Sequence, residues 1–154
     1  MIKIKNLTKT FGVQNSLDNI SLELNKGDSV IIMGQNGAGK TTLIRAMLRA
    51  LGVDSAIKSP TFSLVESYQV RHLHIHHFDL YRIQDESELE YIGFRDYFSK
   101  DAICCIEWPE RVPSCIEHAD VGFSLNMKGT GREMQVRALS SAGTSMLSCL
   151  WGES

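Results

Sequence analysis

Residues 34 to 42 read GQNGAGKTT and match the pattern G-x-x-x-x-G-K-[ST]. Loops of this kind surround phosphate oxygens with backbone N–H groups, and their lysine adds a positive charge. The same loop serves transporters, kinases, GTPases and small ATPases, and a chance glycine-rich turn is the alternative. The residues expected to contact the nucleotide here are Gly37, Ala38, Gly39, Lys40, Thr41 and Thr42.

Three of these residues have side chains with a specific expected task. Lys40 is expected to reach the β- and γ-phosphates of ATP. The hydroxyl of Thr41 is the expected ligand for Mg²⁺, and Thr42 is placed to hydrogen-bond a phosphate. The motif therefore predicts both a nucleotide and a metal ion.

A Mg²⁺ ion at a triphosphate also needs at least one carboxylate near the loop. The candidates are Asp79, in HHFDLYR, and Glu107, in ICCIEWPE. Each follows an apolar or aromatic strand end, where a bare carboxylate is costly unless it meets a cation or hydrogen-bond donors. The alternatives are that Asp79 caps a helix or turn and that Glu107 forms a salt bridge with an arginine.

The segment HLHIHH suggests a second metal site, because His72, His74 and His76 would share one face of a strand. No cysteine or carboxylate stands at ligand spacing, so a solvated strand face is favoured over zinc binding. His77, beside Phe78 and Asp79, is the better candidate for the nucleotide site.

Trp108 and Pro109 follow Glu107 and predict a rigid, bulky corner. Packing of Trp108 is favoured over stacking on a nucleotide base. Arg82 could pair with Asp79 or with phosphate, and both possibilities stay open.

The elements that must position these residues can be predicted from periodicity. MIKIK and NISLEL alternate apolar and polar residues as half-buried strands do, and Val30 to Met33 form a buried strand that leads into the loop. Apolar residues recur at helical spacing after Lys40, and Gly52 is the expected C-cap. Strand, glycine loop and helix are the context that a phosphate loop requires.

The rest of the chain predicts more strands and two helices. TFSLVESYQV and LHIHHFDLY are expected to be strands, DESELEYIGF a short helix ending near Gly93, and Ala102 to Ile106 a strand that ends in Glu107. DVGFSLNM and EMQVRAL flank KGTGR as a β-hairpin, and SAGTSMLSCLW is a closing helix. This order predicts an α/β fold, a single domain over residues 1 to 154 with a mixed, mainly parallel sheet flanked by helices and nucleotide at the carboxyl ends of its strands.

Composition narrows the function classes. A net charge of −2 gives no reason to expect a basic face that binds nucleic acid unaided. The longest apolar runs are far shorter than a membrane span, and no leader peptide is apparent, so a cytoplasmic location is expected. The four cysteines show no C-x-x-C spacing, and two of them lie inside an apolar run, where thiols behave as small hydrophobes, so a disulfide framework is not expected.

From Gly37 onward the sequence resembles the bacterial TsaE family, whose members serve the synthesis of threonylcarbamoyladenosine in tRNA. The stretches that carry the resemblance are GAGKTTLIRAMLRALG, KSPTFSLVESY, HHFDLYRI, ELEYIGFRDYF, AICCIEWPERV and GREMQVRALSSAG. They follow the order and spacing of the family. SPTF, HFDLYR and IEWPE are much more specific than the phosphate loop.

Residues 1 to 36, together with the loop, resemble the opening of an ABC-transporter ATPase. In that family an aromatic residue after the first strand stacks on adenine, and Phe11 stands at the matching position of this sequence. An ABC ATPase also needs an LSGGQ-type signature, an apolar run that ends in Asp-Glu, and a switch histidine, and none follows Thr42. An intact ABC ATPase is therefore excluded.

The resemblance to TsaE implies a small Mg²⁺-dependent ATPase that acts on a complex of the proteins TsaB and TsaD, with tRNA contacted only indirectly. It assigns Lys40 and Thr41 to triphosphate and Mg²⁺, and Asp79 and Glu107 to metal binding and hydrolysis. Thr61, in SPTF, becomes a candidate nucleotide sensor. The rival hypotheses are a binding module with little turnover, an ABC-type nucleotide-binding fragment and a small-molecule kinase, although no lid segment is recognisable.

Overall fold

The computed structural model describes residues 2–11, 14–24, 27, 29–34, 39–58, 60, 62–128 and 131–150. Its strands are β1 (Ile2–Phe11), β2 (Gln14–Leu24), β3 (Ser29–Gly34), β4 (Val65–Val70), β5 (Leu73–Asp79), β6 (Ala102–Glu107), β7 (Val121–Lys128) and β8 (Gly131–Ala138). The α-helices are α1 (Lys40–Ala50), α2 (Ser87–Tyr91) and α3 (Ser141–Leu150). Three 3₁₀ helices, η1 (Phe94–Tyr97), η2 (Pro109–Arg111) and η3 (Pro113–His118), complete these elements.

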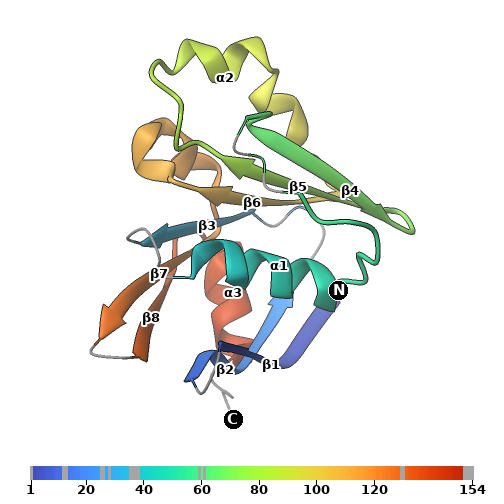
Figure 1. Cartoon of the computed structure of the whole chain (residues 1–154). Coiled ribbons are helices and arrows are strands. Elements are labelled where there is room, and N and C mark those ends of the chain that lie inside the picture. Colours follow the sequence, from blue (N-terminus) through green and yellow to red (C-terminus); the bar gives the residue numbers. More distant parts are fainter. Residues whose placement is uncertain are drawn as a thin grey trace.

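A six-stranded sheet with the order β4-β5-β6-β3-β7-β8 forms the centre of the molecule (Figure 1). β5, β6, β3 and β7 are parallel to one another, and β4 and β8 pair with their neighbours in the antiparallel sense. The predicted mixed, mainly parallel sheet and its closing hairpin, β7 and β8, are confirmed. Because β3, β5 and β6 run in one direction, their carboxyl ends meet at the same edge of the sheet.

Two apolar clusters lie on the two faces of this sheet, because successive side chains of a strand point to opposite faces. On one face Ile75 and Cys105 pack in a cluster with Met47 of α1. On the other face Phe78 and Ile106 belong to a cluster with residues of α2, η1 and η3. Odd-numbered residues of β5 and β6 therefore face α1. The same alternation determines which face the side chains at the ends of these two strands point to.

Helix α1 forms where the sequence predicts it, because its apolar residues repeat along one side. Leu43, Ile44, Met47 and Leu48 are buried. The helix ends at the C-cap Leu51, one residue before the predicted Gly52, which adopts a left-handed φ of 105°. The N–H of Val53 donates to the carbonyl of Leu48 at 3.0 Å and that of Gly52 to Arg49 at 3.1 Å, so the chain leaves α1 through a Schellman turn.

β1 and β2 form a separate antiparallel ribbon. Both strands are longer than MIKIK and NISLEL, because pairing within a hairpin continues through polar residues that break the alternating pattern. Register shifts interrupt the pairing at three places between Ile4 and Thr10. β1 contacts α1, and β2 contacts α3 and β8 (Figure 1).

Two strand boundaries differ from the prediction. β4 begins only at Val65, because the N–H of Leu64 donates to the carbonyl of Pro60 at 2.8 Å in a turn. β5 ends at Asp79 rather than Tyr81, since the Asp79 carboxylate accepts the N–H of Tyr81 at 3.0 Å and turns the chain. The predicted short helix before Gly93 is α2, and the closing helix is α3.

A polar junction joins α3 to the start of β3. The N–H of Ser29 donates to Asp120 Oδ2 at 2.8 Å, and Ser140 Oγ donates to Asp120 Oδ1 at 2.6 Å. Ser140 Oγ also accepts the N–H of Gly143 at 3.0 Å, which makes Ser140 the N-cap of α3. This contact brings the backbone of Gly143 against the carbonyl of Asp120.

Replacement of Gly143 by Ala is expected to destabilise the protein. A Cβ at this position would overlap the Asp120 carbonyl oxygen and lie 3.3 Å from Val121 Cγ2, so α3 would have to shift. Overpacking of this kind costs about 1–3 kcal/mol. Urea unfolding measures the loss, with Ser145→Ala on the exposed side of the same helix as the control. Equal stability of the two variants would contradict the proposed clash.

Candidate nucleotide-binding site

The predicted phosphate-binding residues lie where β3 meets α1. Gly37 and Ala38 are outside the described residues. Gly39 has a left-handed φ of 102° and precedes the first residue of α1, Lys40, so glycine is required at this turn. Thr41 is exposed and Thr42 is half-buried in the first turn of the helix. An N-terminal turn of this kind presents backbone N–H groups that suit an anion.

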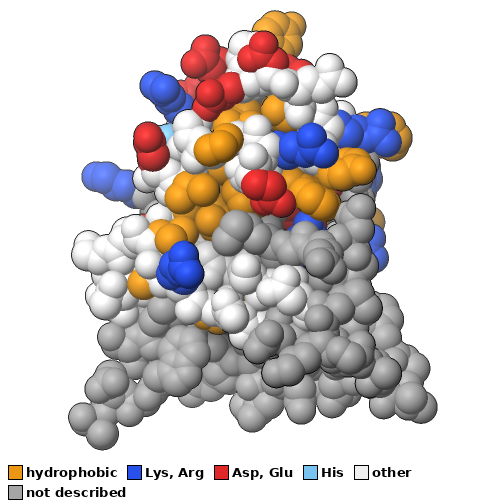
Figure 2. Space-filling model, turned by 90° about the vertical axis from the view of Figure 1, so that its left-hand side faces the viewer, with side chains coloured by type: hydrophobic (Ala, Val, Ile, Leu, Met, Phe, Trp, Pro, Cys, Tyr) orange, Lys and Arg blue, Asp and Glu red, His pale blue; other side chains and the backbone are white. Residues whose placement is uncertain are grey.

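Asp79 and Glu107 are the last residues of β5 and β6, and they are direct partners in the parallel register. Both positions are odd, so their side chains share the face that α1 covers. The two candidate carboxylates, 28 residues apart in sequence, are thus neighbours at the carboxyl edge of the sheet, beside the start of α1. Figure 2 views this edge and shows hydrophobic side chains gathered beside acidic and basic ones.

The carboxylate of Glu107 is buried and held on both sides. Its Oε1 accepts a hydrogen bond from Thr41 Oγ1 at 3.3 Å. Its Oε2 lies 2.7 Å from His77 Nε2, and both side chains are only 2–3% exposed. The alternative of a salt bridge to an arginine is not found among the described contacts of Glu107.

Lys40 is buried beside these carboxylates, and its Nζ lies 3.3 Å from the centre of the Trp108 ring. Burial lowers the pKa of Lys40, while the charges of Glu107, Glu110 and Asp79 act in the opposite direction. Trp108 adopts a left-handed φ of 58° before Pro109, and its ring centre lies 5.0 Å from that of Tyr81. The predicted corner after Glu107 therefore directs an aromatic face toward the lysine.

The pKa of Asp79 is raised, chiefly by burial and also by the charge of Glu107. The N–H of Tyr81 and the charges of His77 and Lys40 favour the carboxylate but do not offset the burial. The hydrogen bond from the N–H of Tyr81 also gives Asp79 the turn-capping role that was the alternative for this residue. Two neighbouring carboxylates, one of them destabilised in its charged form, favour the binding of a cation at this edge.

Removal of the Asp79 charge is expected to stabilise the nucleotide-free protein near neutral pH. A carboxyl group with a pKa raised by folding contributes stability below its unfolded pKa of 3.8, and this stability is lost as pH rises through the raised value. Asp79→Asn, which keeps the acceptor for Tyr81, should therefore raise Tm at pH 7 by roughly 1–3 °C and by less at pH 4.

Thermal unfolding followed by circular dichroism across this pH range measures the effect. Asp54→Asn, at an exposed position, is the control. A lower Tm for Asp79→Asn at pH 7 than for the unchanged protein would contradict the electrostatic interpretation.

The oxygen donors present suit Mg²⁺, which prefers hydroxyl and carboxylate ligands together with phosphate oxygens. Thr41, Asp79 and Glu107 would supply the protein ligands. Among the described residues no group of three or more His, Cys, Asp or Glu side chains could hold a metal ion. A Mg²⁺ ion here would therefore depend on the phosphates for the rest of its coordination.

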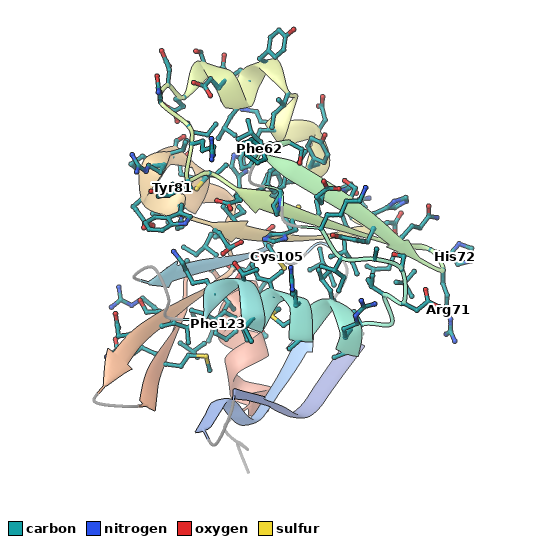
Figure 3. All side chains as sticks on the ribbon, viewed as in Figure 1. Phe62, Arg71, His72, Tyr81, Cys105 and Phe123 are labelled. Carbon is teal, nitrogen blue, oxygen red and sulfur yellow. The ribbon has the colours of Figure 1, made fainter. Side chains whose placement is uncertain are left out.

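The zinc alternative at HLHIHH is not supported within the described part of the chain. Figure 3 places His72 at the tip of the β4–β5 hairpin, at the opposite end of the sheet from Tyr81. The rings of His74 and His76 are parallel at 6.3 Å, and His76 Nδ1 lies 2.7 Å from Ser67 Oγ. His77 points to the other face, which separates it from these two.

Three further sequence predictions have different outcomes. Arg82 stacks its guanidinium 4.4 Å from the ring centre of the exposed Phe62, a contact not predicted from the sequence. Thr61 lies outside the described residues. Phe11 is the last residue of β1, and its side chain is likewise outside what the structure describes.

The contact between His77 and Glu107 was not predicted from the sequence, although His77 was assigned to the nucleotide site. The sequence does show that His77 and Asp79 lie two residues apart, so their side chains share one face of β5. To predict the contact with Glu107 one would also need the register of β5 against β6, which a single sequence does not supply.

Residues 5–136 match the family TsaE, described as the threonylcarbamoyl adenosine biosynthesis protein TsaE. The chain belongs to the TsaE family. The TsaE protein of Haemophilus influenzae, named for tRNA threonylcarbamoyladenosine biosynthesis, is 40% identical over 129 residues, which cover 84% of this chain and 82% of that protein. The Aquifex aeolicus protein of the same name is 42% identical over 96 residues, which cover 60% and 67%.

The crystal structure of Bacillus subtilis YdiB has a TM-score of 0.67 to this TsaE chain at 23% identity, and the match covers 83% of this chain and 79% of that one. It supports the α/β fold. The TsaE match begins at residue 5 and therefore includes most of the segment that resembles an ABC-transporter ATPase. Family likeness thus extends further toward the amino terminus than Gly37.

Proposed function

We propose that this TsaE chain is a Mg²⁺-dependent ATPase that serves threonylcarbamoyladenosine modification of tRNA. Membership of the family ties the chain to threonylcarbamoyladenosine biosynthesis. The observation that carries the proposal of hydrolysis is the pairing of Asp79 with Glu107 at adjacent strand ends, beside Lys40 and Thr41. A site for nucleotide binding alone has less need of two neighbouring carboxylates.

In the proposed reaction water attacks the γ-phosphate of ATP, and the residues act by positioning and by neutralising charge. Lys40 leaves the ring of Trp108 to contact the β- and γ-phosphates. Thr41, Asp79 and Glu107 would hold Mg²⁺, and the bound ion would neutralise charge on the phosphates. Asp79, on the same face as Glu107, would also be placed to orient the water. Thr61 as a nucleotide sensor and Phe11 as the residue that stacks on adenine complete the proposed set.

The proposed partners are TsaD, the threonylcarbamoyl transferase, and TsaB. The chain would not transfer the carbamoyl group itself, and it would reach tRNA only through these proteins, in keeping with its net charge of −2. No helix in the described part of the chain is long and apolar enough to cross a membrane. We place the protein in the cytoplasm, as one domain over residues 1 to 154.

The rival is a binding module that holds ATP but hardly hydrolyses it. Two measurements on the same protein distinguish an ATPase from such a binding module. Trp108 fluorescence, in a Trp151→Phe background, should change on titration with ATP because Lys40 leaves the indole ring. Phosphate release with Mg²⁺ present should then exceed that with EDTA. Binding without Mg²⁺-dependent release would favour the module, and no binding would contradict both.

A further inference from the structure

His77 is a buried polar side chain that stands between two apolar residues and the Asp79 carboxylate along its row of β5. It is 2% exposed and follows Leu73 and Ile75 on the face of β5 that α1 covers. Its Nε2 lies 2.7 Å from Glu107 Oε2. Because a carboxylate oxygen only accepts, Nε2 is the donor of this hydrogen bond.

The other ring nitrogen, Nδ1, is buried and has no hydrogen-bond partner among the described residues. A buried polar atom without a partner costs free energy, and such atoms are rare in folded proteins. An apolar side chain at this position would avoid that cost, so burial alone does not account for a histidine here. The contact with Glu107 is what distinguishes His77 from the apolar residues of its row.

That contact determines how the Glu107 carboxylate is presented. The terminal torsion of a glutamate side chain is broad, so an unheld carboxylate rotates easily. His77 occupies Oε2, which leaves Oε1 toward Thr41 Oγ1 at 3.3 Å. The hydroxyl and Oε1 are thereby brought together on the side of α1, where the phosphate loop ends.

We propose that His77 is a positioning residue that fixes the orientation of Glu107, so that one carboxylate oxygen stays beside Thr41 to hold Mg²⁺ at the triphosphate. The proposal rests on the proposed function. It requires the Nε2 donor and no change in the charge of the ring. His77 itself contacts neither nucleotide nor metal.

Two substitutions separate the donor from the ring. In His77→Gln the side-chain amide nitrogen lies near the position of Nε2, so it can still donate to Glu107. In His77→Asn the amide ends near the position of Nδ1 and does not reach the carboxylate. His76→Asn is the matched control, because His76 lies next along β5 on the opposite face and contacts Ser67.

With His77→Asn we expect kcat for ATP hydrolysis to fall about 10- to 100-fold, and the Mg²⁺ concentration for half-maximal rate to rise, because lost support of a metal ligand has effects of this size. KM for ATP should change little, since the phosphate loop is untouched. His77→Gln should restore most of the rate. His76→Asn should equal the unchanged protein.

Two readouts do not depend on turnover. Calorimetry of a non-hydrolysable ATP analogue should show a smaller gain in affinity from Mg²⁺ in His77→Asn than in the unchanged protein. Crystal structures of the nucleotide-free proteins should show Glu107 Oε1 within 3.5 Å of Thr41 Oγ1 in the unchanged protein and rotated away in His77→Asn.

An unchanged Glu107 orientation in His77→Asn would overturn the positioning role, whether or not the protein hydrolyses ATP. Unaltered kcat and Mg²⁺ dependence in an active protein would do the same and leave the proposed function intact. If the unchanged protein fails to hydrolyse ATP while Glu107 rotates in the variant, the proposed hydrolysis fails and the positioning role stands.

Discussion

Replacement of Lys40 by Ala is expected to remove detectable ATP hydrolysis and to weaken ATP binding roughly 10- to 150-fold. Lys40 is buried next to Glu107 and Asp79, so its charge lies at the proposed phosphate site. Loss of a charged hydrogen bond costs about 1.5–3 kcal/mol, which corresponds to this change in affinity. The loss of hydrolysis should be larger, because charge develops on the phosphoryl oxygens during the reaction.

Calorimetry with ATP measures the affinity of the Lys40 variant, since the variant also changes the environment of Trp108. Arg45→Ala, at an exposed position of the same helix, is the control for general effects on α1. Lys40→Ala with the ATP affinity of the control would show that this loop does not bind the triphosphate as proposed.

Glu107→Gln is expected to lower the rate of ATP hydrolysis by about 10²–10³-fold, the typical effect of removing one preorganised electrostatic group. The amide keeps the size of the side chain but loses the charge that faces Thr41 and His77. ATP affinity should change much less, because the loop and Lys40 are intact. The Mg²⁺ concentration needed for the remaining activity should rise.

Single-turnover phosphate release measures the hydrolytic step of the Glu107 variant. Glu110→Gln is the matched control, because Glu110 also acts on the charge of Lys40 but is exposed and lies outside the strand end. Equal losses in both variants would mean that net charge near Lys40 matters, rather than the placement of Glu107.

Most of what the sequence predicts about the site follows from short-range patterns. The loop must stand between a strand and a helix, and the apolar repeat from Leu43 to Leu48 gives that helix. Asp79 and Glu107 are candidates because each follows an apolar or aromatic strand end. Each is the last residue of its strand, although the strand of Asp79 is predicted to continue to Tyr81. Local order of this kind is visible in one sequence because it depends on neighbours within a few residues.

Contacts that depend on strand order were not predictable in the same way. The partnership of Asp79 with Glu107, and of His77 with Glu107, requires β5 and β6 to be adjacent and in one particular register. The stacking of Arg82 on Phe62 likewise joins two segments about twenty residues apart. Outside a hairpin such as β7 and β8, this sequence does not show which strands will be neighbours, so these contacts come from the structure.

For the amino-terminal segment, the sequence predicts the strands but not how they pair. Alternation in MIKIK and NISLEL correctly indicates two strands, but their pairing as a separate ribbon rather than as part of the main sheet is a tertiary property. Resemblance to an ABC-transporter ATPase over residues 1 to 36 coexists with a TsaE match that starts at residue 5.

The proposed contact of Phe11 with adenine can be tested by measuring the affinities for ATP and for GTP in Phe11→Ala and in the unchanged protein.

The measurement that addresses the proposed function most directly is steady-state ATP hydrolysis by the purified protein, alone and with purified TsaB and TsaD, with Mg²⁺ present and Lys40→Ala as the inactive control. We expect slow hydrolysis by the chain alone, stimulation by the two proteins together, and no activity of Lys40→Ala in either condition. Hydrolysis that TsaB and TsaD leave unchanged would contradict a role in threonylcarbamoyladenosine modification through these partners.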